Sequence, residues 1–276
     1  MLLFAIVIAL PRSDAGRVTD TPGPAEDAER DPATPDTAAR PDPEAPYRGT
    51  LYVVIDDAGY SLRELQPFLA LPQPLTISVL PHLPRSVEAA ERTREAGKEV
   101  MLHLPMEAGN GADPGPGAVY VALDDHDIRQ RVLAAFASVP GAVGANNHMG
   151  SRATADRRVM DVVVSVLGEN GGWFLDSRTS ADSVVRAAAE AAGIPFLERH
   201  VFLDNRRDRD YIRAAMAEGM EIASERGYAV MIGHVMVAEL AEVLMEMYPA
   251  ILDRGFEFGF ITDLVATSVA YERSGN

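Results

Sequence analysis

The stretch that decides the fold is Leu51-Tyr52-Val53-Val54-Ile55-Asp56-Asp57-Ala58-Gly59, in which five apolar residues are followed by two aspartates. A continuous apolar run rich in β-branched side chains predicts a strand that is buried on both faces, as in a parallel sheet. In parallel α/β folds the functional residues gather at the carboxyl ends of the strands. The two aspartates therefore stand where a functional site is expected.

Apolar runs of the same kind recur along the chain, and helical stretches separate most of them. The further runs are 75–80, 99–102, 172–175, 195–203, 228–232 and 256–261, and the amphipathic stretches are 85–96, 127–137, 156–168, 183–192, 208–225 and 238–253. Strands that alternate with helices predict βαβ units and a parallel sheet. The α/β chain has about seven such units, which favours a closed or nearly closed barrel.

The composition limits the classes of function. A formal net charge of -16 argues against nucleic acid and anionic membrane surfaces as main partners, because both are polyanions. The absence of cysteine excludes thiolate catalysis, disulfides and cysteine-ligated zinc. Any metal ion must then be held by His, Asp, Glu, carbonyl groups or water.

Two segments precede the predicted domain. Residues 1–10 are almost wholly apolar. A membrane-spanning helix needs about 20 residues, so this segment is too short to be one. It is similar to the apolar core of a secretory signal. Residues 11–46 are rich in proline, alanine and acidic residues, which predicts a disordered linker. We expect a truncated signal or membrane anchor over 1–10, the linker over 11–46, the domain over 47–268 and a tail over 269–276. The expected location is the periplasm, or the cell envelope through an N-terminal tether.

Most polar residues that follow the predicted strands are of types that bind metals or transfer protons. They are Asp56 and Asp57, His103 and Glu107, Asn146 to His148, Asp176 and Ser177, Asp204, and His234. Adjacent carboxylates repel each other unless a cation or hydrogen-bond donors separate their roles, so one can bind a metal while the other acts as a base. A helix cap beside a solvated acid is the alternative for this pair.

The remaining candidates also have two interpretations each. His103, beside Pro105 and Glu107, indicates a structured functional loop, against a histidine satisfied within the core. The stretch 146–151 has the composition of a turn, to which His148 adds an imidazole that commonly binds zinc. Asp176 and Asp204 could each orient a ligand histidine or cap the following helix. His234 is a candidate general acid.

Six motifs together resemble the divergent polysaccharide deacetylase family. They are VIDDAG (54–59), LHLPME (102–107), NNHMGS (146–151), FLDS (174–177), VFLDN (201–205) and GH (233–234), in the order of the family and covering about residues 50–264. The resemblance implies a distorted (β/α)7 barrel of the polysaccharide deacetylase type. It also implies a divalent transition metal as cofactor, with zinc expected from the ligand types.

The resemblance assigns roles to the motif residues. Asp56 corresponds to the catalytic base and Asp57 to a metal ligand. Where the wider superfamily has two histidines four residues apart, this sequence has His103 and Glu107, so His148 is expected to replace the missing ligand. The residues expected to support the ligands or contact the substrate are Glu107, Asn147, Asp176, Ser177 and Asp204.

The implied reaction is metal-assisted hydrolysis of a linear amide, in which acetyl groups are removed from an N-acetylated envelope polysaccharide. Asp56 would take a proton from the attacking water, and His234 would protonate the departing amine. Two alternatives stay open. The first is an inactive, metal-stabilised barrel that binds glycan or an envelope protein. The second is a glycoside hydrolase, although adjacent aspartates on a strand should point to different sides rather than across a scissile bond.

Overall fold

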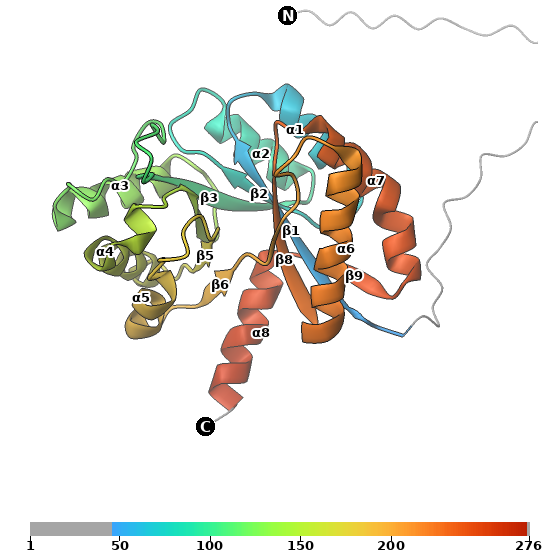
Figure 1. Cartoon of the computed structure of the whole chain (residues 1–276). Coiled ribbons are helices and arrows are strands. Elements are labelled where there is room, and N and C mark those ends of the chain that lie inside the picture. The colour runs from blue at the N-terminus through green and yellow to red at the C-terminus, as the bar shows by residue number, and fades with distance from the viewer. Residues whose placement is uncertain (1–45, 275–276) are drawn as a thin grey trace, which may run out of the picture. The chain divides into compact units, whose positions relative to one another are not determined.

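A parallel sheet with helices around it forms the body of the protein (Figure 1). The computed structural model describes residues 46–274, so the predicted signal segment and nearly all of the predicted linker lie outside the described residues. Within that range no helix is long and apolar enough to cross a membrane.

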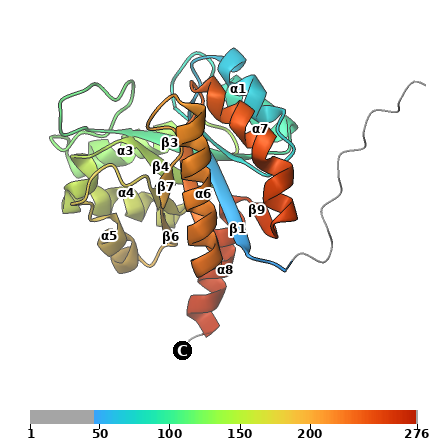
Figure 2. The ribbon, with the colours of Figure 1, turned by 45° about the vertical axis from the view of Figure 1, so that its right-hand side comes forward.

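The strands and helices alternate for most of the chain. The strands are β1 (Gly49–Ala58), β2 (Thr76–Val79), β3 (Glu99–Met106), β4 (Ala145–Met149), β5 (Phe174–Asp176), β6 (Phe196–Glu198), β7 (Val201–Phe202), β8 (Tyr228–His234) and β9 (Phe256–Gly259). The helices are α1 (Leu62–Leu69), α2 (Ser86–Glu95), α3 (Asp125–Ala137), the 3-10 helix η1 (Ala153–Ala155), α4 (Arg157–Glu169), α5 (Val185–Ala192), α6 (Arg209–Arg226), α7 (Ala238–Asp253) and α8 (Ile261–Ser274). Helix α6 packs against β1 and β8, and Figure 2 shows it in front of the sheet beside β1.

The sheet is built on β1, which pairs with three other strands. It pairs with β8 along residues 50–56, and also with β9 through its first residues and with β2 through its last. Leu51, Val53 and Ile55 belong to the apolar core shared with the helices, whereas Tyr52 and Val54 belong to a second cluster inside the curled sheet. Burial on both faces explains why the run is apolar at every position.

The segment 196–203 links the two edges of the sheet. Its first half, β6, pairs with β5, and its second half, β7, pairs with β8. At the bend between them, the N–H of Arg199 donates to the carbonyl oxygen of Asp176 (3.0 Å) and the N–H of His200 donates to that of Val230 (2.8 Å). The segment therefore acts as one bent strand of the barrel. Together with β1, β2, β3, β4, β5 and β8 it completes the distorted (β/α)7 barrel predicted from the sequence.

The interior of the barrel changes from apolar to polar along the strands. On β1, Tyr52 and Val54 are followed by Asp56, and on β3, Met101 is followed by His103, all of them buried. Side chains two positions apart share one face of a strand, so each strand carries one polar residue into the carboxyl end of the same interior.

The start of helix α8 packs against the amino-terminal end of the barrel, and the rest of the helix extends below the sheet in Figure 1. Its residues Ile261 and Leu264 belong to the apolar cluster of the barrel interior. Its first turn is held by the carboxylate of Glu99, which accepts hydrogen bonds from the N–H of Thr262 (3.2 Å) and the hydroxyl of Thr76 (2.7 Å). Burial raises the pKa of this carboxyl group. The amino-terminal end of the barrel is thus covered by apolar residues of α8, which half-buried hydrogen bonds of Glu99 hold in place.

The structure differs from the predicted elements in further places besides the bend that divides the predicted strand 195–203. Residues 146–148, for which a turn was one of two interpretations, lie within β4, where tertiary hydrogen bonds outweigh the turn preference of asparagine. The predicted strand 256–261 ends at Gly259, and α8 then continues through Ser274, so it includes most of the predicted tail. Helix α1 was not predicted, since it is short and contains Pro67.

We expect Leu264→Ala to lower the free energy of unfolding by about 2–5 kcal/mol, because the side chain is buried in the barrel and its loss leaves a cavity. Met245→Ala, at an exposed position on α7, is the control and should change stability by less than about 0.5 kcal/mol. Urea denaturation measures both. Equal effects of the two substitutions would mean that α8 does not contribute to the core.

Candidate metal centre and active site

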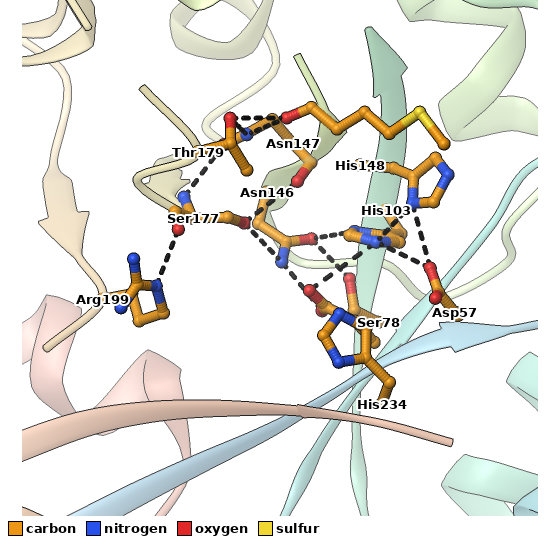
Figure 3. A network of polar contacts seen from close by, with 12 residues as sticks. Asp57, Ser78, His103, Asn146, Asn147, His148, Ser177, Thr179, Arg199 and His234 are labelled. Carbon is orange, nitrogen blue, oxygen red and sulfur yellow. Dashed lines mark hydrogen bonds and ion pairs between the residues drawn. The ribbon is translucent and has the colours of Figure 1, made fainter. Parts of the chain in front are cut away.

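Three side chains predicted as metal ligands meet at the carboxyl ends of three strands (Figure 3). Asp57 comes from β1, His103 from β3 and His148 from β4. Oδ1 of Asp57 lies 3.2 Å from Nε2 of His103 and 2.9 Å from Nδ1 of His148, and the two histidine nitrogens are 3.1 Å apart. These are the three residues that were predicted from the sequence as metal ligands.

A left-handed backbone at Asp57 places both adjacent carboxylates in the site. Asp57 has φ of 67°, and the pairing of β1 with β2 shifts register between Ile55 and Ala58. A regular strand would turn Asp56 and Asp57 to opposite sides, as the sequence analysis expected, but the bulge re-aims the second residue. Aspartate tolerates this conformation better than most side chains. The expectation of opposed side chains was therefore wrong.

The donor set of this cluster fits a divalent transition metal. Oδ1 of Asp57 is buried and has no aligned hydrogen-bond donor, although two imidazole nitrogens lie close to it. Donor atoms each about 2.1 Å from a common ion are separated by about 3.0–3.4 Å, which is close to the spacings found here. Two imidazoles and a carboxylate form a ligand set typical of zinc and its neighbours.

The electrostatics of the cluster keep Asp57 ionised. Burial opposes ionisation, but the neighbouring His103 and His148 outweigh it and hold the pKa of the Asp57 carboxyl well below its usual range. Burial likewise opposes protonation of His103, yet the carboxylates of Asp56 and Asp57 raise its pKa. Two adjacent carboxylates therefore lie beside the imidazole of His103, an arrangement that favours a positive charge there.

Asp56, the predicted base, lies beside the three donor atoms. Its Oδ2 is 3.6 Å from Nε2 of His103, and its Oδ1 accepts a hydrogen bond from Nδ2 of Asn146 (2.9 Å). Burial raises the pKa of the Asp56 carboxyl group. A carboxylate of raised basicity next to the donor cluster can accept a proton from a group bound there.

His234, the predicted acid, is oriented by Asp204. Nδ1 of His234 lies 2.9 Å from Oδ1 of Asp204, whose Oδ2 accepts the backbone N–H of the same histidine (2.6 Å), and the ring stacks on Phe202. Burial lowers the pKa of His234, but the hydrogen bond to Asp204 and the charge of Asp56 raise it to about 9. Of the two interpretations of Asp204, the geometry supports the acceptor that orients a histidine.

Glu107 and Asp176 organise loops and make no hydrogen bond with the three clustered residues. The Glu107 carboxylate accepts hydrogen bonds from the N–H of Val121 (2.7 Å) and from Arg152 (2.8 Å). Asp176 accepts from the N–H of Arg178 (2.7 Å) and the hydroxyl of Ser183 (2.6 Å). Neither carboxylate contacts a histidine of the site. For Asp176, orienting a ligand histidine is therefore not supported.

Asn147 and Ser177 join β4 to the loop after β5. Oδ1 of Asn147 accepts the N–H of Ser177 (2.9 Å), and the Ser177 hydroxyl donates to the carbonyl oxygen of Asn147 (3.0 Å). The side-chain Nε–H of Arg199 donates to the carbonyl oxygen of Ser177 (2.7 Å), which connects this loop to the bent segment 196–203. Asn147 and Ser177 make no hydrogen bond with Asp57, His103 or His148; Ser177 is linked to His103 through the side chain of Asn146.

Asn146 and Ser78 have no role predicted from the sequence, yet both contact the site. Oδ1 of Asn146 lies 2.8 Å from Nδ1 of His103 and accepts the hydroxyl of Ser78 (2.5 Å). Two signals were present: Ser78 is a polar residue inside an apolar run, and Asn146 is two positions from His148, hence on the same face of a strand.

Solved structures share this fold. An uncharacterized protein from Agrobacterium tumefaciens C58 has a TM-score of 0.74 at 23% identity, covering 82% of this chain and 93% of that one. A structure described as T48 deacetylase with substrate has a TM-score of 0.50 at 13% identity, covering 80% and 92%. At these identities the likeness establishes the fold alone: a parallel (β/α) barrel, here with a polar cluster at the carboxyl ends of its strands.

Matches to related sequences and to a family model identify the family of the chain. An uncharacterized protein from Haemophilus influenzae (strain Rd) is 32% identical over 184 residues, and the uncharacterized protein YibQ from Escherichia coli K12 is 33% identical over 186 residues. Both matches cover 67% of this chain, but only 66% and 58% of the two relatives, so the chain spans less than two thirds of their length. Residues 53–265 match the family described as divergent polysaccharide deacetylase, and the chain belongs to that family.

We expect Asp204→Asn to destabilise the protein in a pH-dependent way. The raised pKa of His234, about 9 against an ordinary 6.5, means that the paired state stabilises the fold fully below about pH 6.5 and loses its effect as pH rises through 9. The His234 side chain is about a third exposed, so we expect a loss of about 1–2 kcal/mol at pH 6. Urea denaturation at pH 6 and pH 10 should show the difference between parent and variant shrinking. A difference that grows with pH would contradict the assignment.

Proposed function

We propose that the protein is a metal-dependent hydrolase that removes acetyl groups from an N-acetylated polysaccharide of the cell envelope. The observation that carries the proposal is the cluster of Asp57, His103 and His148, with Asp56 and His234 nearby. The family described as divergent polysaccharide deacetylase supports the substrate class. The apolar segment 1–10 supports a location outside the cytoplasm, in the periplasm or tethered to the envelope.

Asp57, His103 and His148 would hold the ion, and zinc suits this ligand set best. A divalent ion held there would polarise the acetyl carbonyl and activate the attacking water. Asp56 takes the proton from that water, whose oxygen forms a bond to the acetyl carbon. His234 is protonated at neutral pH because its pKa lies near 9, so it can donate a proton to the amine as the C–N bond breaks. The products are acetate and the free amino sugar.

Metal binding is the first test. We expect about one equivalent of zinc in the parent and loss of this metal in Asp57→Ala and His148→Ala, because each substitution removes one of three ligands. His126→Ala, at an exposed position of α3, is the matched histidine control and should keep the metal. Elemental analysis of the purified proteins measures the content. Retention of the full equivalent in both ligand variants would place the metal elsewhere.

Hydrolysis is the second test. We expect acetate release from oligosaccharides of N-acetylglucosamine, and a drop in kcat of about 10²–10⁴-fold in Asp56→Asn with metal content unchanged, since the variant loses a proton acceptor and no ligand. If the parent binds metal but hydrolyses neither N-acetylated nor O-acetylated sugars, the inactive barrel that binds glycan or an envelope protein becomes the better account.

A further inference from the structure

The side chain of Asn146 is fully buried, and all of its hydrogen-bonding positions are used. Nδ2 donates to Oδ1 of Asp56 (2.9 Å) and to the hydroxyl oxygen of Ser177 (3.2 Å). Oδ1 accepts from the hydroxyl of Ser78 (2.5 Å) and lies 2.8 Å from Nδ1 of His103. One amide therefore contacts both the predicted base and a predicted ligand, and Figure 3 shows this amide beside His103.

The partners of this amide fix its orientation. An ionised carboxylate only accepts hydrogen bonds, so the group that faces Asp56 must be the NH2 of Asn146. The carbonyl oxygen then faces His103 and can only accept, which places the proton of the neutral imidazole on Nδ1. Nε2 of His103 is left with its lone pair directed at the cluster that contains Asp57 and His148.

The same amide separates the roles of the two adjacent aspartates. It occupies Oδ1 of Asp56 and leaves Oδ2 facing the donor cluster at 3.6 Å from His103. Asp57 receives no contact from Asn146, and its Oδ1 has no aligned donor at all. One carboxylate is thus held by a neutral donor while the other stays available to a cation.

We propose that Asn146 is a positioning residue, which sets the tautomer of His103 for metal binding and holds Asp56 in place as the base. The catalytic half of this proposal rests on the proposed function, whereas the tautomer of His103 does not depend on it. Histidine ligands ordinarily donate their second N–H to an acceptor of this kind, and loss of such acceptors costs about 10–100-fold in metal affinity.

The neighbouring Asn147 supplies a matched control. It has the same side chain and the same burial, but its amide contacts Ser177, Thr179 and the backbone of Met149, and not His103 or Asp56. Asn147→Ala therefore reports the cost of removing a buried amide from β4 without touching the ligand histidine.

The test combines two readouts on the parent, Asn146→Ala and Asn147→Ala. Long-range ¹H–¹⁵N spectra of the histidine rings at alkaline pH show which nitrogen of His103 carries the proton in the metal-free protein. We expect the Nδ1–H form in the parent and in Asn147→Ala, and a mixture in Asn146→Ala. Titration with Co²⁺, followed by its visible spectrum, should show affinity about 10–100-fold weaker and a changed spectrum in Asn146→Ala alone.

Asn146→Asp keeps the shape of the side chain if the alanine variant does not fold. Its carboxylate still accepts from His103 but cannot replace the N–H donated to Asp56, so we expect Co²⁺ affinity near that of the parent and at least about tenfold slower hydrolysis. An unchanged His103 tautomer and unchanged Co²⁺ affinity in Asn146→Ala would overturn the proposal, as would full turnover in Asn146→Asp. A parent that binds no Co²⁺ but shows the Asn146-dependent tautomer would instead refute the proposed function and leave the positioning role.

Discussion

The left-handed backbone at Asp57 is the constraint on which the site depends. Without the shift in register beside it, one of two adjacent carboxylates would face away from the barrel interior. His103 and Asn146 are brought together by regular parallel pairing of β3 with β4, which also aligns Pro105 with His148. A single strained residue on the central strand therefore completes an arrangement that regular strands otherwise supply.

The amino-terminal end of the barrel interior is apolar, whereas its carboxyl end is polar. At the amino end, the first turn of α8 covers apolar side chains of the barrel interior, and the half-buried carboxylate of Glu99 accepts hydrogen bonds from Thr76 and Thr262. At the carboxyl end, Oδ1 of Asp57 is left without an aligned partner. Gln73 and Thr93 also have buried polar atoms without a partner, so what marks Asp57 as a site residue is the nearness of two imidazole nitrogens to its Oδ1.

Most of the barrel and its three clustered residues could be predicted from the sequence, since buried strands are apolar at every position and the polar residues follow them. Strand β4 could not, because Asn146 and Asn147 favour turns locally and only their long-range partners make them strand residues. The bend at Arg199 and His200 was equally hidden, since the apolar run 195–203 gives no sign that its halves pair with different strands. Contacts between distant segments decide these features, and no local pattern records them.

The apolar contact of α8 with the barrel also has a consequence for how the chain is made. Synthesis proceeds from the amino terminus, so every strand of the sheet leaves the ribosome before Ile261 and Leu264. Until those residues emerge, the apolar lining around Tyr52 and Met101 has nothing to cover it from below. A chain cut short by premature termination therefore keeps its barrel interior open to water, and only a chain translated as far as its last helix can seal it.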